Sequence, residues 1–137
     1  MAKSGTKQVA ALPYRNHGEG MEVLLITSRE TRRWVIPKGW PMPKRSDSSA
    51  AEREAFEEAG IEGKMGRKSI GSYVYDKRKK SGRTLKVQVT VYAMEVSRLL
   101  DEWPEKGERE RRWFGVTEAA DLVQEDGLQA IIEAALA

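Results

Sequence analysis

The sequence contains no cysteine, a single histidine and no long apolar run. Without cysteine, the chain forms no disulfide, has no thiolate nucleophile and cannot hold a cysteine-ligated zinc ion. A membrane helix needs about 18 or more successive apolar residues, so the absence of such a run predicts a chain that does not span a membrane. Residues 1–8 also lack the apolar stretch of a signal peptide, and we expect the protein in the cytoplasm.

Internal repeats, low-complexity segments and an obvious linker are absent as well. The 137 residues therefore predict one domain, residues 1–137, large enough for an ordinary hydrophobic core. The apolar fraction of 39% and the charged fraction of 33% are typical of a soluble protein with a charged surface. The only histidine, His17, lies in a polar turn beside Gly18, and we do not expect it to be catalytic.

Carboxylates, by contrast, are dense in the segment REAFEEAGI, residues 53–61. Residues three and four apart share a helix face, so Glu54, Glu57 and Glu58 project together. Each like-charge pair weakens an isolated helix by about 0.2–0.5 kcal/mol, and a bound divalent cation would reverse that effect. Hard oxygen ligands suit Mg²⁺ or Mn²⁺. Acidic helix faces are also common on solvated surfaces, so this segment alone leaves both interpretations open.

The preceding segment has the features of a rigid loop that follows a strand. Residues 34–36 predict a short strand, which Pro37 ends because proline lacks an N–H for the ladder. Gly39 permits a tight turn or a close approach of the backbone to an ion. Pro41 and Pro43 stiffen the loop.

Both ends of the acidic helix have recognisable capping residues. Ser49, with Glu52 three positions later, predicts a capping box at the N-terminus, and Asp47 and Ser48 are alternative caps. Gly60 is expected to end the helix in a left-handed conformation. A strand, a rigid loop and a capped acidic helix together favour an ion-binding unit.

Residues 39–61 resemble the Nudix box, whose pattern is glycine, five residues, glutamate, seven residues, then Arg-Glu-apolar-any-Glu-Glu-any-Gly-apolar. The matching positions are Gly39, Arg53, Glu54, Ala55, Glu57, Glu58, Gly60 and Ile61. Arg45 departs from the pattern at its first glutamate, and Asp47, two residues later, is a candidate substitute. The resemblance implies an α+β fold, the Nudix α/β/α sandwich with a mixed sheet between helices.

The resemblance also implies a Nudix pyrophosphohydrolase, which hydrolyses a phosphoanhydride in a nucleoside diphosphate linked to another group or in a related polyphosphate. Cations would neutralise phosphate charge while a carboxylate takes a proton from the attacking water. Carried over to this sequence, Glu54, Glu57 and Glu58 would bind Mg²⁺ or Mn²⁺, and Gly39 would offer its carbonyl. Arg53 would orient a glutamate rather than touch the substrate.

Beyond the box, the chain is similar to the branch of diphosphoinositol polyphosphate phosphohydrolases and dinucleoside polyphosphate hydrolases. The similarity lies in residues 28–29, 33–37, 82–84 and 108–114. It implies that Lys7, Arg83 and Arg109 contact substrate phosphates, and we expect Ser28, Arg29 and Lys38 as further substrate contacts. Lys38 is a departure, because that branch has glycine there, and this lysine either adds a phosphate contact or only fills the surface.

Basic residues gather in residues 29–45 and 77–83, although the net charge is only +3. These clusters are either solvated turns or a rim that attracts a polyphosphate, which the glutamates alone would repel. Nucleic acid also binds basic patches, but aromatic residues do not alternate with these lysines as single-strand binding favours. We therefore expect a small polyphosphorylated substrate rather than nucleic acid, and both a monomer and a homodimer remain open.

The remaining patterns predict a mixed sheet with helices. The expected strands are residues 8–14, ended by Pro13, and residues 22–27, 70–75, 85–96 and 112–114. Residues 76–83 are expected as a hairpin loop. Thr117 is expected to cap a short helix through Leu122, and a last helix begins after Asp126 or Gly127.

Three functions follow from these features: a metal-dependent pyrophosphohydrolase, a catalytically silent ligand sensor on the same fold, and a nucleic-acid-binding module. A silent sensor predicts the loss of a box carboxylate, and all three are present. Nucleoside triphosphates and sugar nucleotides are alternative substrates. The sequence does not choose a general base among the glutamates of the loop that supplies one in other members: Glu102, Glu105, Glu108 and Glu110.

Overall fold

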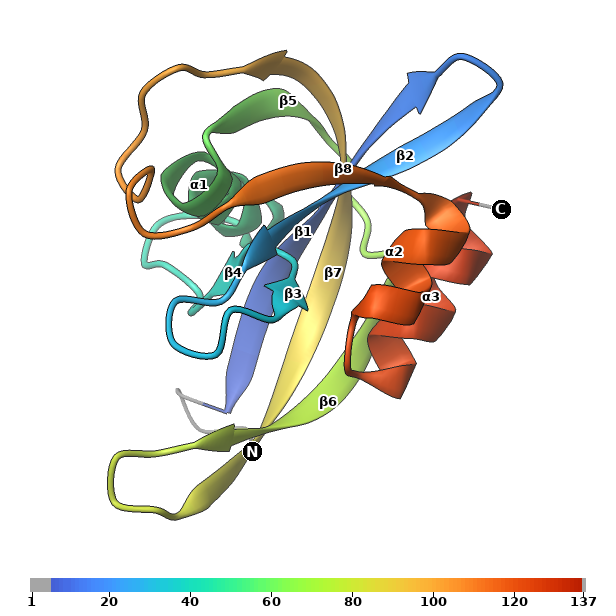
Figure 1. Ribbon diagram of the computed structural model, residues 1–137. Helices are drawn as coiled ribbons and strands as arrows, with labels where there is room; N and C mark the ends of the chain where they lie inside the picture. Colours follow the sequence, from blue (N-terminus) through green and yellow to red (C-terminus); the bar gives the residue numbers. More distant parts are fainter. Residues whose placement is uncertain (1–5, 137) are drawn as a thin grey trace.

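The computed structural model describes residues 6–136, which form a mixed β-sheet with helices on both faces (Figure 1). In chain order the elements are β1 Lys7–His17, β2 Gly20–Thr27, β3 Trp34–Val35, β4 Lys38–Gly39, α1 Asp47–Ala59, β5 Ile61–Met65, β6 Gly71–Arg78, β7 Thr84–Leu99, β8 Arg111–Gly115, α2 Val116–Leu122 and α3 Asp126–Leu136. The predicted α/β/α sandwich is confirmed. Of the helices within residues 6–136, none is long and apolar enough to cross a bilayer.

The central strand β1 organises the sheet. It runs parallel to β7 on one side and antiparallel to β2 and β4 on the other. Strand β5 pairs with β7 at the far edge, so β4 and β5 lie on opposite sides of β1. Helix α1 crosses this part of the sheet and contacts both of them. The site described below lies where α1 meets β4.

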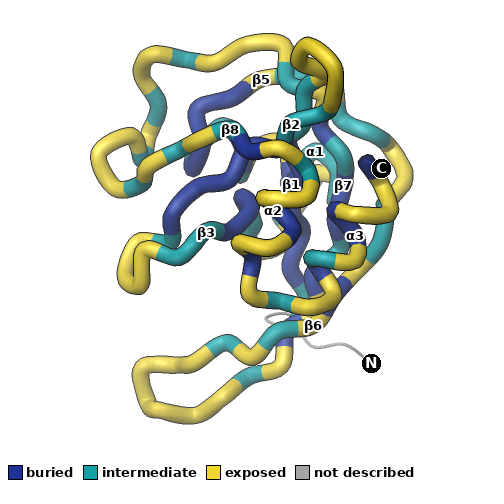
Figure 2. The backbone as a smooth tube through the Cα atoms, turned by 45° about the vertical axis from the view of Figure 1, so that its right-hand side comes forward, coloured by how far each residue is buried: buried dark blue, intermediate teal, exposed yellow. Residues whose placement is uncertain are grey.

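Side chains of β1 alternate between two apolar layers, as the period of a strand requires. Val9 and Ala11 pack in the layer beneath α1, which also contains Ala55. Ala10 and Leu12 pack in the layer beneath α2 and α3. Figure 2 shows the central strands as buried and the loops and the β6–β7 hairpin as largely exposed. Both faces of β1 are therefore covered, which explains its nearly continuous apolar sequence.

The first strand continues past Pro13, so the expectation that this proline ends it is wrong. Pro13 pairs with Met94 in the parallel ladder with β7. On its other side, β1 pairs with β4 at Val9 and Ala10 and with β2 from Tyr14 onward. Pro13 thus lies where β1 changes neighbour, and proline is tolerated at such an interruption of the ladder.

Helix α1 begins before the predicted capping box. Its N-cap is Ser46, whose Oγ accepts a hydrogen bond from the backbone N–H of Ser49 at 3.2 Å. The prediction of Ser49 as the cap, with Asp47 and Ser48 as alternatives, is therefore wrong. Gly60 ends the helix as predicted, with φ 65° and ψ 42°, and its N–H bonds the Phe56 carbonyl.

Three other elements differ from expectation. Strand β5 was not predicted, because Gly63 and charged residues break its apolar alternation and the strand carries a bulge there. The N-cap of α2 is Gly115 rather than Thr117, and no side chain bonds the first turn. Strand β6 extends into the expected hairpin loop as far as Arg78, and β7 begins at Thr84 and continues to Leu99. Their tip projects beyond the helices at the bottom of Figure 1.

Candidate active site

The C-terminal half of α1 faces β4 and packs two glutamates against its backbone. Glu58 has only 9% of its surface exposed, and its Oε1 accepts a hydrogen bond from the backbone N–H of Lys38 at 3.2 Å. The carboxylate of Glu54 lies against Gly39, where a Cβ atom would overlap it. Glycine at position 39 is therefore needed for Glu54 to keep this place.

Glu54 and Glu58 are close enough to share a hydrogen bond, and their ionisation is coupled. Burial, followed by the charge of Glu57, raises the pKa of Glu54 to about 7. Burial also raises the pKa of Glu58 to about 7, although the guanidinium of Arg109 opposes this shift. The negative charge of Glu105 raises the pKa of both carboxyls. In the absence of a cation, the site therefore holds protons near neutral pH.

Glu57 has a different partner from the other two box glutamates. Its Oε2 accepts a hydrogen bond from Nε of Arg53 at 3.0 Å, one helical turn away. Consequently no three acidic or histidine side chains converge on one point in the part of the chain that the structure describes. The chemistry of the donors nevertheless fits a hard divalent cation, because carboxylates and a backbone carbonyl are the oxygen ligands it prefers. Burial is the largest cause of the raised pKa values of Glu54 and Glu58, and the neighbouring carboxylates add to it.

The loop between β7 and β8 brings Arg109 and Glu105 into the same site. Arg109 is almost fully buried, and its Nε lies 2.8 Å from Oε1 of Glu105. Its Nη2 lies 3.6 Å from Oε2 of Glu58, and its Nη1 donates to the Thr27 carbonyl at 3.2 Å. The backbone N–H of Glu105 also donates to the carbonyl of Glu57 at 3.0 Å. The loop is thus tied to α1 by main-chain and side-chain bonds.

Of the four loop glutamates that the sequence left open, Glu105 reaches the box glutamates. The ion pairs of the other three are Glu102 with Lys106, Glu108 with Arg29, and Glu110 with Arg112. The sequence could not make this distinction, because the four residues lie within nine positions and share one side-chain chemistry. Only the course of the loop separates them.

The structure brings three of the residues expected to contact substrate near these glutamates. Arg109 lies between Glu58 and Glu105. Arg29 pairs with Glu108 at 3.2 Å, and this bond, followed by the charge of Glu105, raises its pKa. The amino group of Lys38 lies 4.7 Å from the centre of the Tyr75 ring, and burial lowers the pKa of this lysine.

The other three lie elsewhere. Ser28 hydrogen-bonds the Thr31 hydroxyl at 2.7 Å within the loop after β2. Arg83 is exposed at the tip of the β6–β7 hairpin. Nζ of Lys7 lies 3.1 Å from Oδ2 of Asp47 at the start of α1, seven residues before Glu54 and thus about 10 Å away along the helix.

Asp47, the candidate substitute for the missing first glutamate of the box, lies at the start of α1. That carboxylate is bound to Lys7 and braces the start of α1 against β1. Arg45, at the missing position, donates from Nη1 to the Ser49 hydroxyl at 3.1 Å. Both contacts support the start of the helix rather than the box carboxylates.

Arg111 is a residue whose position in the site the sequence did not indicate. Its guanidinium donates to the carbonyls of Ala59, Gly60 and Leu100 at 2.8–3.0 Å and lies 4.0 Å from the centre of the Trp103 ring. The last carbonyls of a helix have no partner within the helix, so Arg111 satisfies them and joins α1 to the Glu105 loop. Within the run of residues 108–112, ERERR, no pattern distinguishes this arginine.

Comparisons with known proteins agree with this geometry. A model of the NUDIX domain family matches residues 6–134. Diphosphoinositol polyphosphate phosphohydrolase 3-beta of Bos taurus is 33% identical over 120 residues, which cover 86% of this chain and 69% of that protein.

Two solved structures share the fold. The structure of a C. elegans Ap4A hydrolase binary complex matches with a TM-score of 0.68 at 20% identity. The match covers 93% of this chain and 93% of that chain. The NUDIX domain of Shewanella oneidensis NrtR, complexed with ADP ribose, has a TM-score of 0.71 at 16% identity, over 98% of this chain and 88% of that one. The expected family and branch resemblance are confirmed: the chain belongs to the Nudix family and is a Nudix hydrolase.

Proposed function

We propose that this chain is a divalent-metal-dependent pyrophosphohydrolase that cleaves a phosphoanhydride in a small polyphosphorylated substrate. The diphosphoinositol polyphosphate or dinucleoside polyphosphate type is favoured. The observation that carries this proposal is the pair formed by Glu54 and Glu58, buried against the backbone of β4 and coupled to Arg109 and Glu105. The names of the phosphohydrolase relative and of the Ap4A hydrolase support the substrate class. The family match to residues 6–134 supports a single domain.

The residues that would hold Mg²⁺ or Mn²⁺ are Glu54, Glu57 and Glu58, with the carbonyl of Gly39. When bound, the cation neutralises phosphate charge and activates a water molecule for attack. Glu57 would exchange Arg53 for the cation. This exchange costs little, because the Arg53–Glu57 pair is partly exposed, with 44% and 31% of the side chains accessible, and pairs of this kind contribute about 0–1 kcal/mol.

Glu105 is the acidic side chain that we propose as general base. Its carboxylate shares Arg109 with Glu58, and its backbone is bonded to Glu57, so it stays beside the glutamates without competing for their positions. Arg109 then acts as a positioning residue, because it joins Glu105 to Glu58 and is anchored on the Thr27 carbonyl. A carboxylate that accepts the proton must lie within hydrogen-bond distance of the attacking water. The bond to Arg109 holds the carboxylate of Glu105 in one position beside the box glutamates.

The basic side chains around the site are spread over a long path, which favours an extended polyanion. Arg29 pairs with Glu108 in the loop that carries Glu105, Lys38 joins β4 to Glu58 through its backbone N–H, and Lys7 lies about 10 Å along α1 from Glu54. Arg83 is exposed at the tip of the β6–β7 hairpin, and this hairpin projects beyond the helices (Figure 1). A substrate with several separated phosphates would use more of these charges than a compact one.

A panel of substrates with Mg²⁺ tests the proposal: nucleoside triphosphates, dinucleoside polyphosphates, sugar nucleotides and diphosphoinositols. We expect Mg²⁺-dependent hydrolysis of at least one of them, measured from the phosphorylated products, and loss of that hydrolysis in Glu57→Gln and Glu58→Gln variants that keep the circular dichroism of the wild type. Glu62→Gln is the matched control, because Glu62 is exposed on β5 and pairs with Arg98. Activity without a divalent cation, or equal activity of all three variants, would refute the assignment.

A further inference from the structure

Strand β6 is an edge strand, and in the part of the chain that the structure describes it pairs with β7 alone. At the hairpin, the N–H of Lys79 donates to the carbonyl of Arg83, so these two residues form a hydrogen-bonded pair of the antiparallel ladder. Bonded and non-bonded pairs alternate along such a ladder, and the N–H and C=O groups that point away from β7 are therefore those of Ser72, Val74 and Asp76. No described residue bonds these outward groups.

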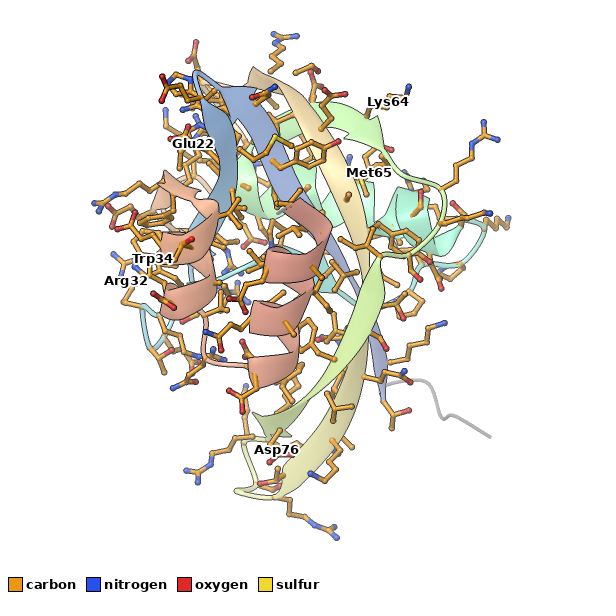
Figure 3. All side chains as sticks on the ribbon, turned by 90° about the vertical axis from the view of Figure 1, so that its right-hand side faces the viewer. Glu22, Arg32, Trp34, Lys64, Met65 and Asp76 are labelled. Carbon is orange, nitrogen blue, oxygen red and sulfur yellow. The ribbon has the colours of Figure 1, made fainter. Side chains whose placement is uncertain are left out.

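The outer side of this strand is open to solvent. Val74 has 57% of its surface exposed, the largest fraction among the exposed large apolar side chains of residues 6–136. Ser72 and Asp76, two positions to either side, are exposed as well. Figure 3 labels Asp76 on the hairpin that projects beyond the helices. An open edge with an apolar centre is a template on which another extended chain can form a strand.

Basic side chains flank this edge at both ends. They are, before the strand, Arg67 and Lys68 and, at its end, Lys77, Arg78, Lys79 and Lys80. Within residues 6–136 none of these side chains forms an ion pair, whereas Asp76, the carboxylate of the strand, pairs with Lys86 at 3.0 Å. The 8 residues of β6 span about 27 Å, so Val74 lies between two separated groups of positive charge.

These charges decide which chain fits the edge. A second copy that paired antiparallel through β6 would bring its own basic hairpin end beside Arg67 and Lys68, and like charges repel. A single-stranded nucleic acid would meet the positive charge but would leave the outward N–H and C=O groups without a ladder. An extended polypeptide with acidic ends satisfies both the charges and the backbone groups.

We propose that β6 binds an extended acidic segment of a partner protein, which adds a strand to the sheet. The central residues of this segment would be β-branched, and one would pack beside Val74, because cross-strand neighbours of this kind stabilise a sheet. Its acidic residues would lie against the basic groups at the two ends of β6. In the sheet, β1 and β7 separate β6 from β4, against which the box glutamates pack, so the partner does not occupy the proposed metal site.

Titration of the isotope-labelled protein with the synthetic peptide acetyl-EEVTVTVEE-amide, without a divalent cation, tests the proposal by NMR. We expect the amides of Ser72, Val74 and Asp76 to shift to saturation and to gain protection from hydrogen exchange, because they become hydrogen-bonded to the peptide. The amides of Tyr73 and Tyr75 already bond β7, and their exchange should change little.

Two substitutions at one position separate strand addition from charge attraction. Val74→Pro should weaken binding about tenfold or more, because it removes an outward donor and the side chain beside it, while the ladder to β7 does not use that N–H. Val74→Thr keeps the N–H and the branched side chain and should bind as the wild type does. If Val74→Pro does not fold, the same peptide N-methylated at each central residue replaces it: this peptide keeps its charges, lacks the central donors and should not bind the wild-type protein.

The peptide acetyl-KKVTVTVKK-amide tests the charge requirement and should not bind. The proposal is overturned if this basic peptide binds as well as the acidic one, if Val74→Pro or N-methylation leaves the affinity unchanged, or if the amides of Ser72, Val74 and Asp76 stay in place. Shifts of the Lys79 and Lys80 amides with oligothymidylate, but with neither peptide, would also overturn it and would assign the basic ends to nucleic acid. These measurements involve neither a divalent cation nor hydrolysis, so their failure leaves the proposed pyrophosphohydrolase untouched.

Discussion

Replacement of Arg111 by methionine should loosen the C-terminal end of α1 without altering the box carboxylates. The side chain makes three hydrogen bonds to the carbonyls of Ala59, Gly60 and Leu100, and it stacks on Trp103. A hydrogen bond that involves a charged group contributes about 1.5–3 kcal/mol, but the three share one donor group and the freed carbonyls partly regain water. We therefore expect a loss of about 3 kcal/mol in the free energy of unfolding.

The assay is thermal and urea unfolding, with Arg112→Met as the matched control. Arg112 is the next residue, but its ion pair with Glu110 is more than half exposed, so its loss should cost less than about 1 kcal/mol. For a domain of this size, about 3 kcal/mol corresponds to a decrease of about 10 °C in Tm. Equal destabilisation by the two substitutions would refute the reasoning, because it would show that the contacts to the helix end contribute nothing specific.

Three further predictions concern the site itself. Gly39→Ala should lower kcat at least about a hundredfold with an unchanged circular dichroism spectrum, because the new Cβ overlaps the Glu54 carboxylate; a wild-type rate would contradict the proposed geometry. Without divalent cations, the free energy of unfolding should fall as pH rises from about 4.5 to about 7. The pKa of Glu54 and Glu58 is near 4.5 in the unfolded state and near 7 in the folded state. The unfolded state therefore loses its protons first, and a rise in pH favours it. Urea unfolding at several pH values measures this slope, which Glu54→Gln should flatten; an unchanged slope in that variant would count against the coupling. Arg83→Ala should raise KM chiefly for the most highly phosphorylated substrates, and an equal rise for every substrate of the panel would exclude a role for the hairpin charge.

The features that could be predicted from the sequence are those set by neighbouring residues. Gly60 adopts the left-handed conformation that a helix end favours, and this depends on the glycine alone. The fold class follows in the same way from local alternation and from the box spacing. Strand β5 escaped prediction because its partner β7 lies about thirty positions away and its own alternation is broken at Gly63. The cap of α1 was misplaced because Ser46, Asp47 and Ser48 are equally good caps by composition.

In the candidate site, too, the sequence predicted what depends on neighbouring residues and missed what depends on distant ones. The spacing of the box glutamates predicts that they lie on one helix. It does not predict their partners, which come from β4 and from the loop before β8. The selection of Glu105 among four glutamates depends on the bond from its backbone to Glu57. Arg109 is expected to meet substrate phosphates, and without substrate its side chain contacts Glu58, Glu105 and the Thr27 carbonyl. Contacts of this kind join segments about fifty residues apart, and a local pattern cannot report them.

The partners of the three box glutamates explain how one helix tolerates their charges and which contact yields first to a cation. Arg53 balances the charge of Glu57, and Arg109 and the backbone N–H of Lys38 balance the charge of Glu58. Glu54 shares a hydrogen bond with Glu58, and its raised pKa favours the uncharged carboxyl. These partners differ in burial: the Arg53 pair is partly exposed, whereas the side chains of Arg109 and Glu58 are only 9% and 11% accessible. Exposed pairs contribute little, and breaking a buried pair costs several times more. The Arg53 contact and the bound proton should therefore yield to a divalent cation before the Arg109 contact does, and Arg109 would stay in place to hold Glu105 beside the site.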